Sequence, residues 1–295
     1  MNGILNIDKP AGMTSHDVVA RVRRLARIKR VGHAGTLDPD ATGVLLVCLG
    51  PATRLADHLA AQGKEYQATL VLGCTTNTED ASGAIIAETD ASHVTEADLR
   101  AVLPRFLGEI QQVPPMVSAV HHEGRRLYDL ARQGITVERQ ARPVQIDALT
   151  MQNFSPGPRA RATLEVACGK GTYIRTLCAD LGAALGVGGM MGDLRRTRVG
   201  RFDVADAVLP AGITEDALPG LLHSPSSALA DLPAHRAADA AAREAVAHGR
   251  ALMTDLEDAS VVRVIDSADI LLALARAEGG YLYPFAVFPT EAGAP

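Results

Sequence analysis

A glycine-rich loop that precedes an apolar run carries the side chains best suited to chemistry. Residues 32–50 include His33 and two carboxylates, Asp38 and Asp40, and end in a run with the length and composition of a buried strand. Glycines let this backbone approach a ligand closely, whereas Pro39 holds Asp38 in an extended conformation. A stiff turn at the edge of a rigid sheet is a frequent position for catalytic groups. An ionised Asp38 could act there as a nucleophile or stabilise charge; an Asp-Pro turn without chemistry is the alternative.

The segments around this loop carry the periodicity of the elements that must position it. An amphipathic helix is predicted from Ser15, taken as its N-cap, because apolar residues recur at helical spacing up to Leu25. Residues 64–73 alternate in polarity like a half-buried strand, and the polar segment 74–83 is predicted to be a loop. Further elements are expected as a helix opened by a capping box at 95–98, strands at 143–154 and 160–168, and a helix over 173–185.

Charge is distributed unevenly along the 295 residues. Residues 1–202 hold 24 Lys and Arg against 20 Asp and Glu, whereas residues 203–295 hold 5 against 14, within a net charge of −5. The densest basic run, between Arg21 and Arg30, occupies the other positions of the predicted first helix, and residues 119–142 form a second basic segment. A solvated helix face is one interpretation of the first run, and a path for phosphates is the other.

Composition also limits the class of protein. The chain is 47% hydrophobic and can bury a full core. We expect neither a membrane span nor a secretory signal, because no apolar run reaches 18 residues and no basic segment precedes a shorter apolar one. The expected location is therefore the cytoplasm. Four cysteines without a C-x-x-C pair argue against a zinc site or a disulfide framework. The glycines at 186–192 do not fit a dinucleotide loop, because position 191 is Met and the segment follows a predicted helix.

Several segments, in the same order, resemble the TruB family of tRNA pseudouridine synthases. The longest is the loop itself, Gly-His-Ala-Gly-Thr-Leu-Asp-Pro at 32–39 with Ala-Thr-Gly-Val-Leu at 41–45; the others are 3–10, 64–66, 169–175 and 193–197. The resemblance covers residues 2–202 and is weaker beyond them. Asp40 departs from the family pattern, in which an apolar residue is expected, and its influence on Asp38 is left open.

The resemblance implies an activity that isomerises uridine to pseudouridine in the T-loop of tRNA, at position 55. The glycosidic bond between C1′ and N1 is broken, the base rotates, and it is rejoined through C5. This isomerisation demands no redox cofactor, nucleotide or metal, and we expect none. Asp38 is implied to be the catalytic residue, acting by attack at C6, by attack at C1′ or by assisting elimination to a glycal.

The resemblance also implies substrate-binding roles for six residues. Arg175 would pair with Asp38 and keep it ionised. Tyr66 would stack on the uracil, and Tyr173 would line the pocket; judged without the family, each tyrosine is more typical of a half-buried core position.

For three further substrate-binding residues, the resemblance implies roles in base flipping or in ordering the active loop. A target base inside a folded T-loop must be turned out of its stack before it can react. His33 would fill the vacated space, Leu194 would pack under the flipped base, and Lys9 would order the active loop or contact a phosphate. No cofactor-binding or metal-ligating residue is assigned.

The expected fold is α+β, with a mixed, largely antiparallel central sheet of the pseudouridine synthase type flanked by helices. Residues 1–222 are predicted to form the catalytic domain, with a basic flap at about 119–142 that closes over RNA. An alanine-rich helix at 233–248 and apolar runs at 260–265, 270–275 and 281–288 predict a small β-rich, PUA-like module over 233–295. A linker is expected near 219–232.

The expected partner is tRNA, through its T-arm, with no membrane and with the protein as a monomer. Two other functions share the same loop. One is the catalytic subunit of a guide-RNA-dependent pseudouridylase, which usually carries a fuller PUA module and basic extensions. The other is a non-catalytic tRNA-folding factor, against which the presence of Asp38 argues.

Overall fold

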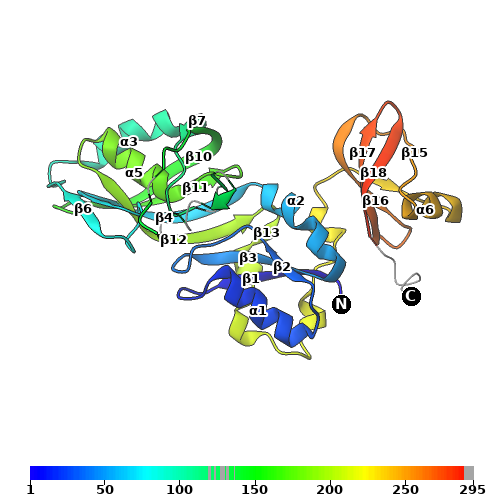
Figure 1. Cartoon of the computed structure of the whole chain (residues 1–295). Coiled ribbons are helices and arrows are strands. Elements are labelled where there is room, and N and C mark those ends of the chain that lie inside the picture. Colours follow the sequence, from blue (N-terminus) through cyan, green and yellow to red (C-terminus); the bar gives the residue numbers. More distant parts are fainter. Residues whose placement is uncertain (119–120, 123, 127–129, 131–132, 136, 289–295) are drawn as a thin grey trace.

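The computed structural model is an α+β fold built on one mixed sheet (Figure 1). It describes residues 1–288 apart from 119–120, 123, 127–129, 131–132 and 136. The strands of the main sheet that the described residues form are ordered β1-β3-β12-β4-β11-β10-β7, with β2 paired to β3 and β13 to β12. Their bounds are β1 Gly3–Lys9, β2 Val31–Ala34, β3 Thr42–Leu49, β4 Lys64–Leu72, β7 Gly108–Gln112, β10 Arg142–Ser155, β11 Arg161–Cys168, β12 Gly189–Val199 and β13 Phe202–Asp203.

The two halves of this sheet meet at a short parallel contact between β3 and β12. Only Thr42 and Gly43 of β3 pair with β12, opposite Arg195 and Arg196, and every other pairing in the sheet's described strands is antiparallel. Gly43 has φ +100°, and a Cβ there would lie 2.1 Å from the carbonyl oxygen of Arg196. Glycine is therefore required where the strands approach. The predicted active loop enters β3 at this junction.

Helices cover the sheet and close separate cores on its two halves. α1 (Ser15–Ala26) packs its valines against β1 and β3, whereas α5 (Ile174–Ala184) and α3 (Glu96–Val102) cover the half built from β4, β10, β11 and β12. The short α2 (Ala56–Ala61) follows a 3-10 helix, η1 (Gly50–Leu55). A further 3-10 turn, η2 (Leu103–Phe106), extends α3. None of the helices among the described residues is long and apolar enough to cross a membrane.

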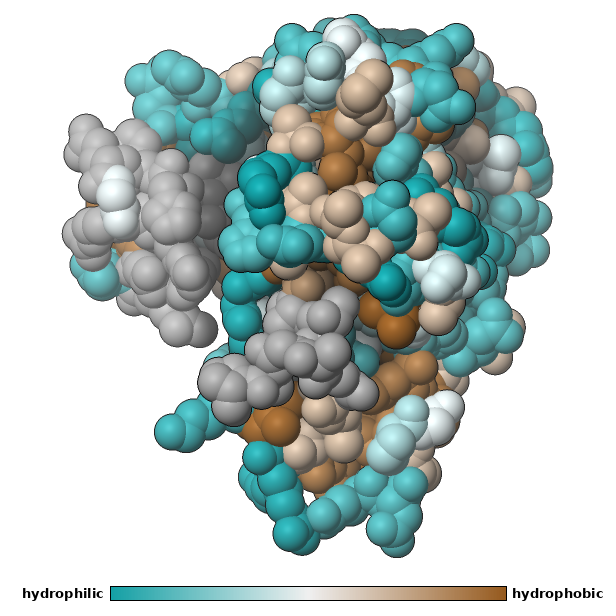
Figure 2. Space-filling view, turned by 90° about the vertical axis from the view of Figure 1, so that its right-hand side faces the viewer, coloured by the Kyte–Doolittle hydropathy of each residue, from teal (hydrophilic) through white to brown (hydrophobic). Residues whose placement is uncertain are grey.

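The C-terminal part forms a second, five-stranded sheet within the described residues, in the order β14-β16-β17-β18-β15, with α6 (Ala240–Ala247) beside it. Tyr281, Tyr283 and Phe285 of β18 are exposed, and the side of the molecule that carries this sheet shows apolar patches among polar ones (Figure 2). One face of the sheet shares a core with η1 and α2 of the main body, through residues such as Leu274 and Leu55. The strands are β14 Ala234–Arg236, β15 Leu252–Met253, β16 Ala259–Ile265, β17 Leu271–Glu278 and β18 Tyr281–Val287.

Several predicted boundaries need correction. Thr14, not Ser15, is the N-cap of α1, in a capping box with Asp17. The polar segment after β4 contains a strand, β5 (Cys74–Thr76), paired with β6 (Ile85–Glu88), because neighbouring chain supplies hydrogen bonds that polarity alone does not reveal.

The alanine-rich segment from 233 begins as a strand, and its helix starts only after Asp239, whose carboxylate caps α6. The expected linker is not free chain either. It contains the 3-10 turns η5 (Leu218–Leu221) and η6 (Ser227–Leu229), and buries Ala228 and Leu229 in the shared core. Shorter 3-10 turns precede them, η3 (Val204–Asp206) and η4 (Pro210–Gly212).

The predicted basic flap lies partly outside the described residues. Two short paired strands belong to it, β8 (His121–His122) and β9 (Arg125–Arg126). At its C-terminal end, Arg139 donates a hydrogen bond to the carbonyl oxygen of Pro114 (2.9 Å). The closing of the flap over RNA stays a prediction.

Candidate active site

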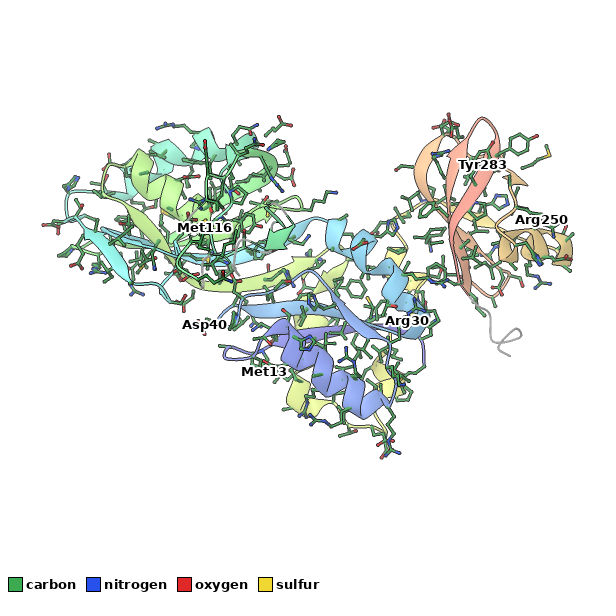
Figure 3. All side chains as sticks on the ribbon, in the orientation of Figure 1. Met13, Arg30, Asp40, Met116, Arg250 and Tyr283 are labelled. Atoms are coloured by element: carbon green, nitrogen blue, oxygen red, sulfur yellow. The ribbon has the colours of Figure 1, made fainter. Side chains whose placement is uncertain are left out.

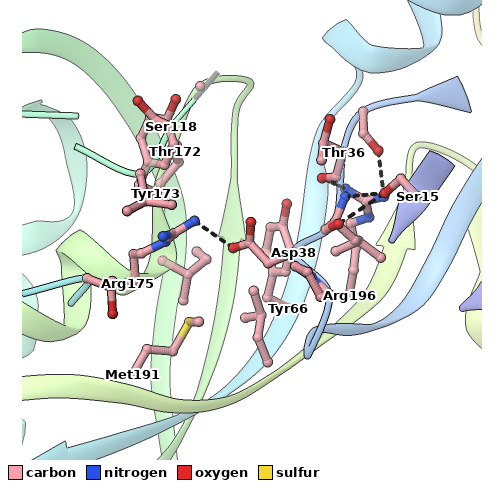
Figure 4. A pocket seen from close by; sticks show the side chains of 18 of the residues that line it. Ser15, Thr36, Asp38, Tyr66, Ser118, Thr172, Tyr173, Arg175, Met191 and Arg196 are labelled. Atoms are coloured by element: carbon pink, nitrogen blue, oxygen red, sulfur yellow. Dashed lines mark hydrogen bonds and ion pairs between the residues drawn. The ribbon is translucent and has the colours of Figure 1, made fainter. Parts of the chain in front are cut away.

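A cleft of about 1090 Å³ opens at the junction of the two half-sheets, and the predicted catalytic loop forms part of its wall. Figure 4 shows Asp38 between Arg175 on one side and Tyr66 and Arg196 on the other. An Nη of Arg175 lies 2.7 Å from a carboxylate oxygen of Asp38. The Arg175 side chain is 7% exposed, whereas that of Asp38 is 42% exposed. The carboxylate therefore faces the cleft while its cationic partner is fixed behind it.

Arg175 is held by a second carboxylate that the sequence did not indicate. Its other Nη lies 3.4 Å from Asp80, whose side chain is 13% exposed. Asp80 is itself oriented, because it accepts hydrogen bonds from the hydroxyls of Thr78 (2.7 Å) and Ser82 (2.6 Å) and from the backbone N–H of Ser82 (3.0 Å). A buried guanidinium between two carboxylates is compensated in charge, so it can keep one geometry toward Asp38.

Lys9 and Ser15 hold the loop from below. Lys9 is fully buried, and its ammonium donates to the carbonyl oxygens of Pro10 (2.9 Å), Met13 (2.7 Å) and Pro39 (2.9 Å). Its contacts support loop ordering, and it does not line the cleft, so a phosphate contact is not supported. The hydroxyl of Ser15 donates to the carbonyl oxygen of Leu37 (3.0 Å) and accepts from its N–H (2.9 Å).

A β-bulge brings apolar side chains of β12 to the cleft. Met191 pairs with Leu70 of β4, and Leu194 pairs with Ala68, so three residues of β12 span two of β4. An even strand would point residues three apart to opposite faces, but the bulge turns Met191 and Leu194 to the same one. Both line the cleft, as the predicted role of Leu194 requires.

Tyr66 faces the cleft from β4, opposite Arg196 of β12. Burial raises the pKa of the Tyr66 hydroxyl, and the Arg196 guanidinium opposes this by a smaller amount. The ring is therefore neutral at physiological pH, with its hydroxyl able to donate.

Arg196 was not assigned a role from the sequence, although it belongs to the segment 193–197. It is 1% exposed and donates to the carbonyl oxygens of Val44 (2.7 Å), Gly35 (3.1 Å) and Thr36 (3.4 Å). These contacts tie the start of the active loop to β12. Its place in the segment 193–197, one of those that resemble the TruB family, is the signal that could have found it.

Tyr173 caps the start of α5 and lines the cleft. Its position depends on Gln112, a buried side chain that accepts from the N–H of Tyr173 (3.0 Å) and donates to its carbonyl oxygen (3.3 Å). No sequence pattern indicates this role of Gln112.

His33 lines the cleft from β2, half-buried, and its Nδ1 has no hydrogen-bond partner among the described residues. Burial lowers the pKa of its imidazole, and Arg196 and His16 lower it further. The ring is therefore neutral at physiological pH, which favours stacking over a charged contact with phosphate.

Asp40 does not converge on this constellation. It is exposed, and in Figure 3 it lies at the edge of the molecule, at the tip of the loop. It borders a smaller hollow of about 270 Å³ that shares Asp38 and Leu194 with the cleft. Among the described residues, no group of three or more His, Cys, Asp or Glu side chains is arranged to hold a metal ion.

The fold and site together are those of enzymes that act on uridine in RNA. The structure resembles the solved Cbf5-Nop10-Gar1 complex with a TM-score of 0.75 and 28% sequence identity, covering 98% of this chain and 86% of that one. Residues 23–174 match the model of the TruB family pseudouridylate synthase N-terminal domain, and residues 175–216 match the tRNA pseudouridylate synthase B C-terminal domain.

Curated relatives lead to the same family. The chain is 51% identical to tRNA pseudouridine synthase B of Symbiobacterium thermophilum over 79% of its length and 77% of that protein. It is 43% identical to tRNA pseudouridine synthase B of Pelotomaculum thermopropionicum over 99% of both chains. The chain belongs to the TruB family of pseudouridine synthases.

Proposed function

We propose that this protein isomerises uridine to pseudouridine in tRNA, at position 55 of the T-loop, without a cofactor. The observation that carries the proposal is the ion pair between Asp38 and Arg175, with the carboxylate turned to a cleft large enough for a nucleotide. The family and the names of its curated members support the reaction and the tRNA substrate.

Asp38 is the proposed catalytic residue. Attack at C6, attack at C1′ and assistance of glycal formation all require its carboxylate to be ionised, and the adjacent guanidinium favours that form. Arg175 is fixed by Asp80, so the pair is organised before substrate arrives. The carboxylate of Asp38 is therefore ionised and oriented before the uridine enters the cleft.

The neighbouring rings and apolar side chains are suited to hold a base that has left its stack. Tyr66 supplies a buried aromatic face, with Leu194 on the adjacent strand and Tyr173 on the cleft wall. His33 supplies a neutral ring for the space that the flipped base leaves in the T-loop. Lys9 acts through the backbone of the loop rather than on the substrate.

The proposal extends to the organisation of the molecule. Residues 1–222 carry the cleft and are proposed as the catalytic domain, and residues 233–295, which hold the second sheet, as a PUA-like module. We propose that the enzyme works as a monomer in the cytoplasm on the T-arm of tRNA. One chain supplies each of the assigned site residues.

A guide-RNA-dependent subunit is the second candidate, favoured by the likeness to the Cbf5-Nop10-Gar1 complex. Incubation of purified protein with a T-arm stem-loop and no other RNA separates the two. Pseudouridine formed under these conditions supports the stand-alone enzyme. A requirement for added guide RNA supports the second candidate.

The test of the site is Asp38→Asn. This variant should form no pseudouridine in T-arm RNA, measured by modification mapping, while its affinity stays within about tenfold, because the change removes the reacting group and no phosphate contact. Asp40→Asn is the matched control and should retain activity, since Asp40 is exposed beside the site. Turnover by Asp38→Asn above a few per cent of the unmodified enzyme would contradict the assignment. An inactive Asp38→Asn would also argue against a purely tRNA-folding role.

A further inference from the structure

Two buried cations line the cleft without a carboxylate partner. Arg196 is 1% exposed and Lys64 is 8% exposed. The hydrogen bonds of Arg196 to backbone run to the carbonyl oxygens of Val44, Gly35 and Thr36, and those of the Lys64 ammonium to the carbonyl oxygens of Ala60 (2.7 Å) and Gln62 (2.8 Å). Within the part of the chain that the structure describes, neither cation forms a salt bridge.

The contrast with Arg175 shows that this arrangement is unusual within the same cleft. Arg175 is just as buried, but two carboxylates balance its charge. Removing a charge from water is costly unless an opposite charge or a full set of hydrogen bonds compensates for it. A pair of neighbouring cations with only neutral partners leaves a positive potential in the cleft, and an anion that enters would be stabilised there.

Lys64 is placed to meet such an anion. It begins β4 two residues before Tyr66, so both side chains lie on the same face of the sheet, and both line the cleft. An ammonium carries three N–H donors, and two of those of Lys64 are used by backbone carbonyls. Those carbonyls fix the ammonium at the end of α2 and leave one donor for a ligand.

We propose that Lys64, with Arg196 behind it, forms a phosphate subsite that binds a backbone phosphate of the RNA next to the flipped nucleotide. The inference rests on the proposed function, because the uracil is taken to stack on Tyr66. With the base on Tyr66, the sugar-phosphate chain of the same nucleotide passes the neighbouring position on β4.

The electrostatics of Lys64 agree with this role. Burial, with smaller contributions from Arg196 and Lys170, lowers the pKa of its ammonium to about 8. A bound phosphodiester supplies the missing negative charge and favours the protonated ammonium. With its pKa still above neutral pH, Lys64 remains mostly protonated, and a bound phosphate would compensate its charge in the cleft.

The experiment combines single neutral linkages in the RNA with substitution of Lys64. A T-arm stem-loop is prepared with one methylphosphonate at each position flanking the target uridine, and its affinity is measured in the Asp38→Asn background. At one position the neutral linkage should weaken binding about tenfold, the scale of a lost charge-assisted hydrogen bond. In protein that also carries Lys64→Met, the same linkage should change affinity less than about twofold, because the partner is already absent.

Two further variants control for folding and for charge. Lys64→Arg keeps the cation and should keep the sensitivity to the same linkage. Arg100→Met removes an exposed cation on α3 and should leave the pattern of the Asp38→Asn protein unchanged. Each comparison is made between two RNAs on one protein, so a loss of stability in Lys64→Met does not imitate the result.

The proposed subsite would be overturned if, at every position, the methylphosphonate weakened RNA binding equally in the protein with Lys64 and in the Lys64→Met protein. Pseudouridine formation by the protein with native Asp38 on the unmodified stem-loop is measured separately. If that reaction occurs and the linkage pattern does not depend on Lys64, only the subsite is wrong. If the reaction does not occur, the proposed function is wrong, whatever the linkages show.

Discussion

The position of Arg175 is electrostatically unfavourable in its own helix. It lies in the first turn of α5, where unpaired backbone N–H groups and the helix dipole disfavour a positive charge. Asp38 and Asp80 offset this cost from two other segments of the chain. The guanidinium of Arg175 therefore contacts both carboxylates, and its orientation toward Asp38 depends on Asp80.

We expect Asp80→Asn to lower kcat for pseudouridine formation by about tenfold or more, with a smaller effect on KM. The amide keeps the size of the side chain but removes the charge that holds Arg175, so the organisation of the reacting carboxylate is lost while the RNA contacts remain. Steady-state kinetics on T-arm RNA measure both constants.

Asp90→Asn is the control for this experiment. Asp90 accepts from the N–H of Ser92 in a turn like that of Asp80 and Ser82, but it is exposed and has no contact with Arg175. Its kinetics should match those of the unmodified enzyme. An Asp80→Asn protein with unchanged kcat would show that Asp38 alone suffices to orient Arg175.

At the scale of elements, α5 joins the site to an acidic pair beneath it. Thr176 on α5 donates to the carboxylate of Glu79 (2.6 Å), and burial raises the pKa of that carboxyl. Burial, and then the neighbouring Glu79, raise the pKa of Asp180 from 3.8 to about 6. The helix therefore carries a partly buried carboxylate whose ionised form is unfavourable in the folded protein.

This raised pKa predicts how stability depends on pH. The folded state binds the Asp180 proton more tightly than the unfolded state, so the contribution of this group is complete below about pH 4 and is lost as the pH rises through 6. Asp180→Asn should therefore raise the midpoint of thermal unfolding at pH 8, by roughly 2 °C, and have little effect at pH 4. Melting curves at the two pH values test this.

Asp216→Asn, at an exposed position, should change neither curve. A stabilisation of the Asp180 variant that is equal at both pH values would mean that packing, and not the carboxylate charge, is responsible.

Across the molecule as a whole, the basic residues between Arg21 and Arg30, in α1 and just after it, serve two purposes. Arg21 donates to the carbonyl oxygen of Pro210 and Arg23 to that of Val31, and Arg27 pairs with Glu215, so these three stabilise the fold. Arg24 and Arg30 are exposed, and Figure 3 shows Arg30 at the opposite end of α1 from Met13. A phosphate path over this surface would depend on the exposed members of the run.

Neutralising Arg24 and Arg30 together should weaken tRNA binding and reduce the slope of log K against log salt by about 1 to 2, since each phosphate contact releases counterions. The double change of Arg100 and Arg105 to Gln, on exposed positions of α3 and η2, is the matched control and should leave the slope as it is. Filter binding at several salt concentrations measures it. An unchanged slope in the first variant would direct attention to the flap at 119–142.

Sequence patterns predicted most of the main elements and the candidate for the reacting carboxylate, Asp38. The apolar runs of β3, β4, β10 and β11 and the period of α1 are local signals, because burial of one face fixes which residues alternate. The loop around Asp38 carried its own signature of glycines and proline, and the resemblance to the TruB family named Arg175 as its partner, a pairing that the structure contains at 2.7 Å.

The surroundings of the Asp38–Arg175 pair are set by contacts between distant segments of the chain. The contacts of Asp80, Gln112 and Arg196 join segments 61 to 161 residues apart. Lys64 reaches the cleft as the first residue of β4, and a bulge in β12 turns Met191 and Leu194 to one face. The exposure of Asp40 is a further example, because two residues of separation on a turn do not determine whether side chains converge. Such placements depend on strand register and on three-dimensional packing, which no local pattern of residue types specifies.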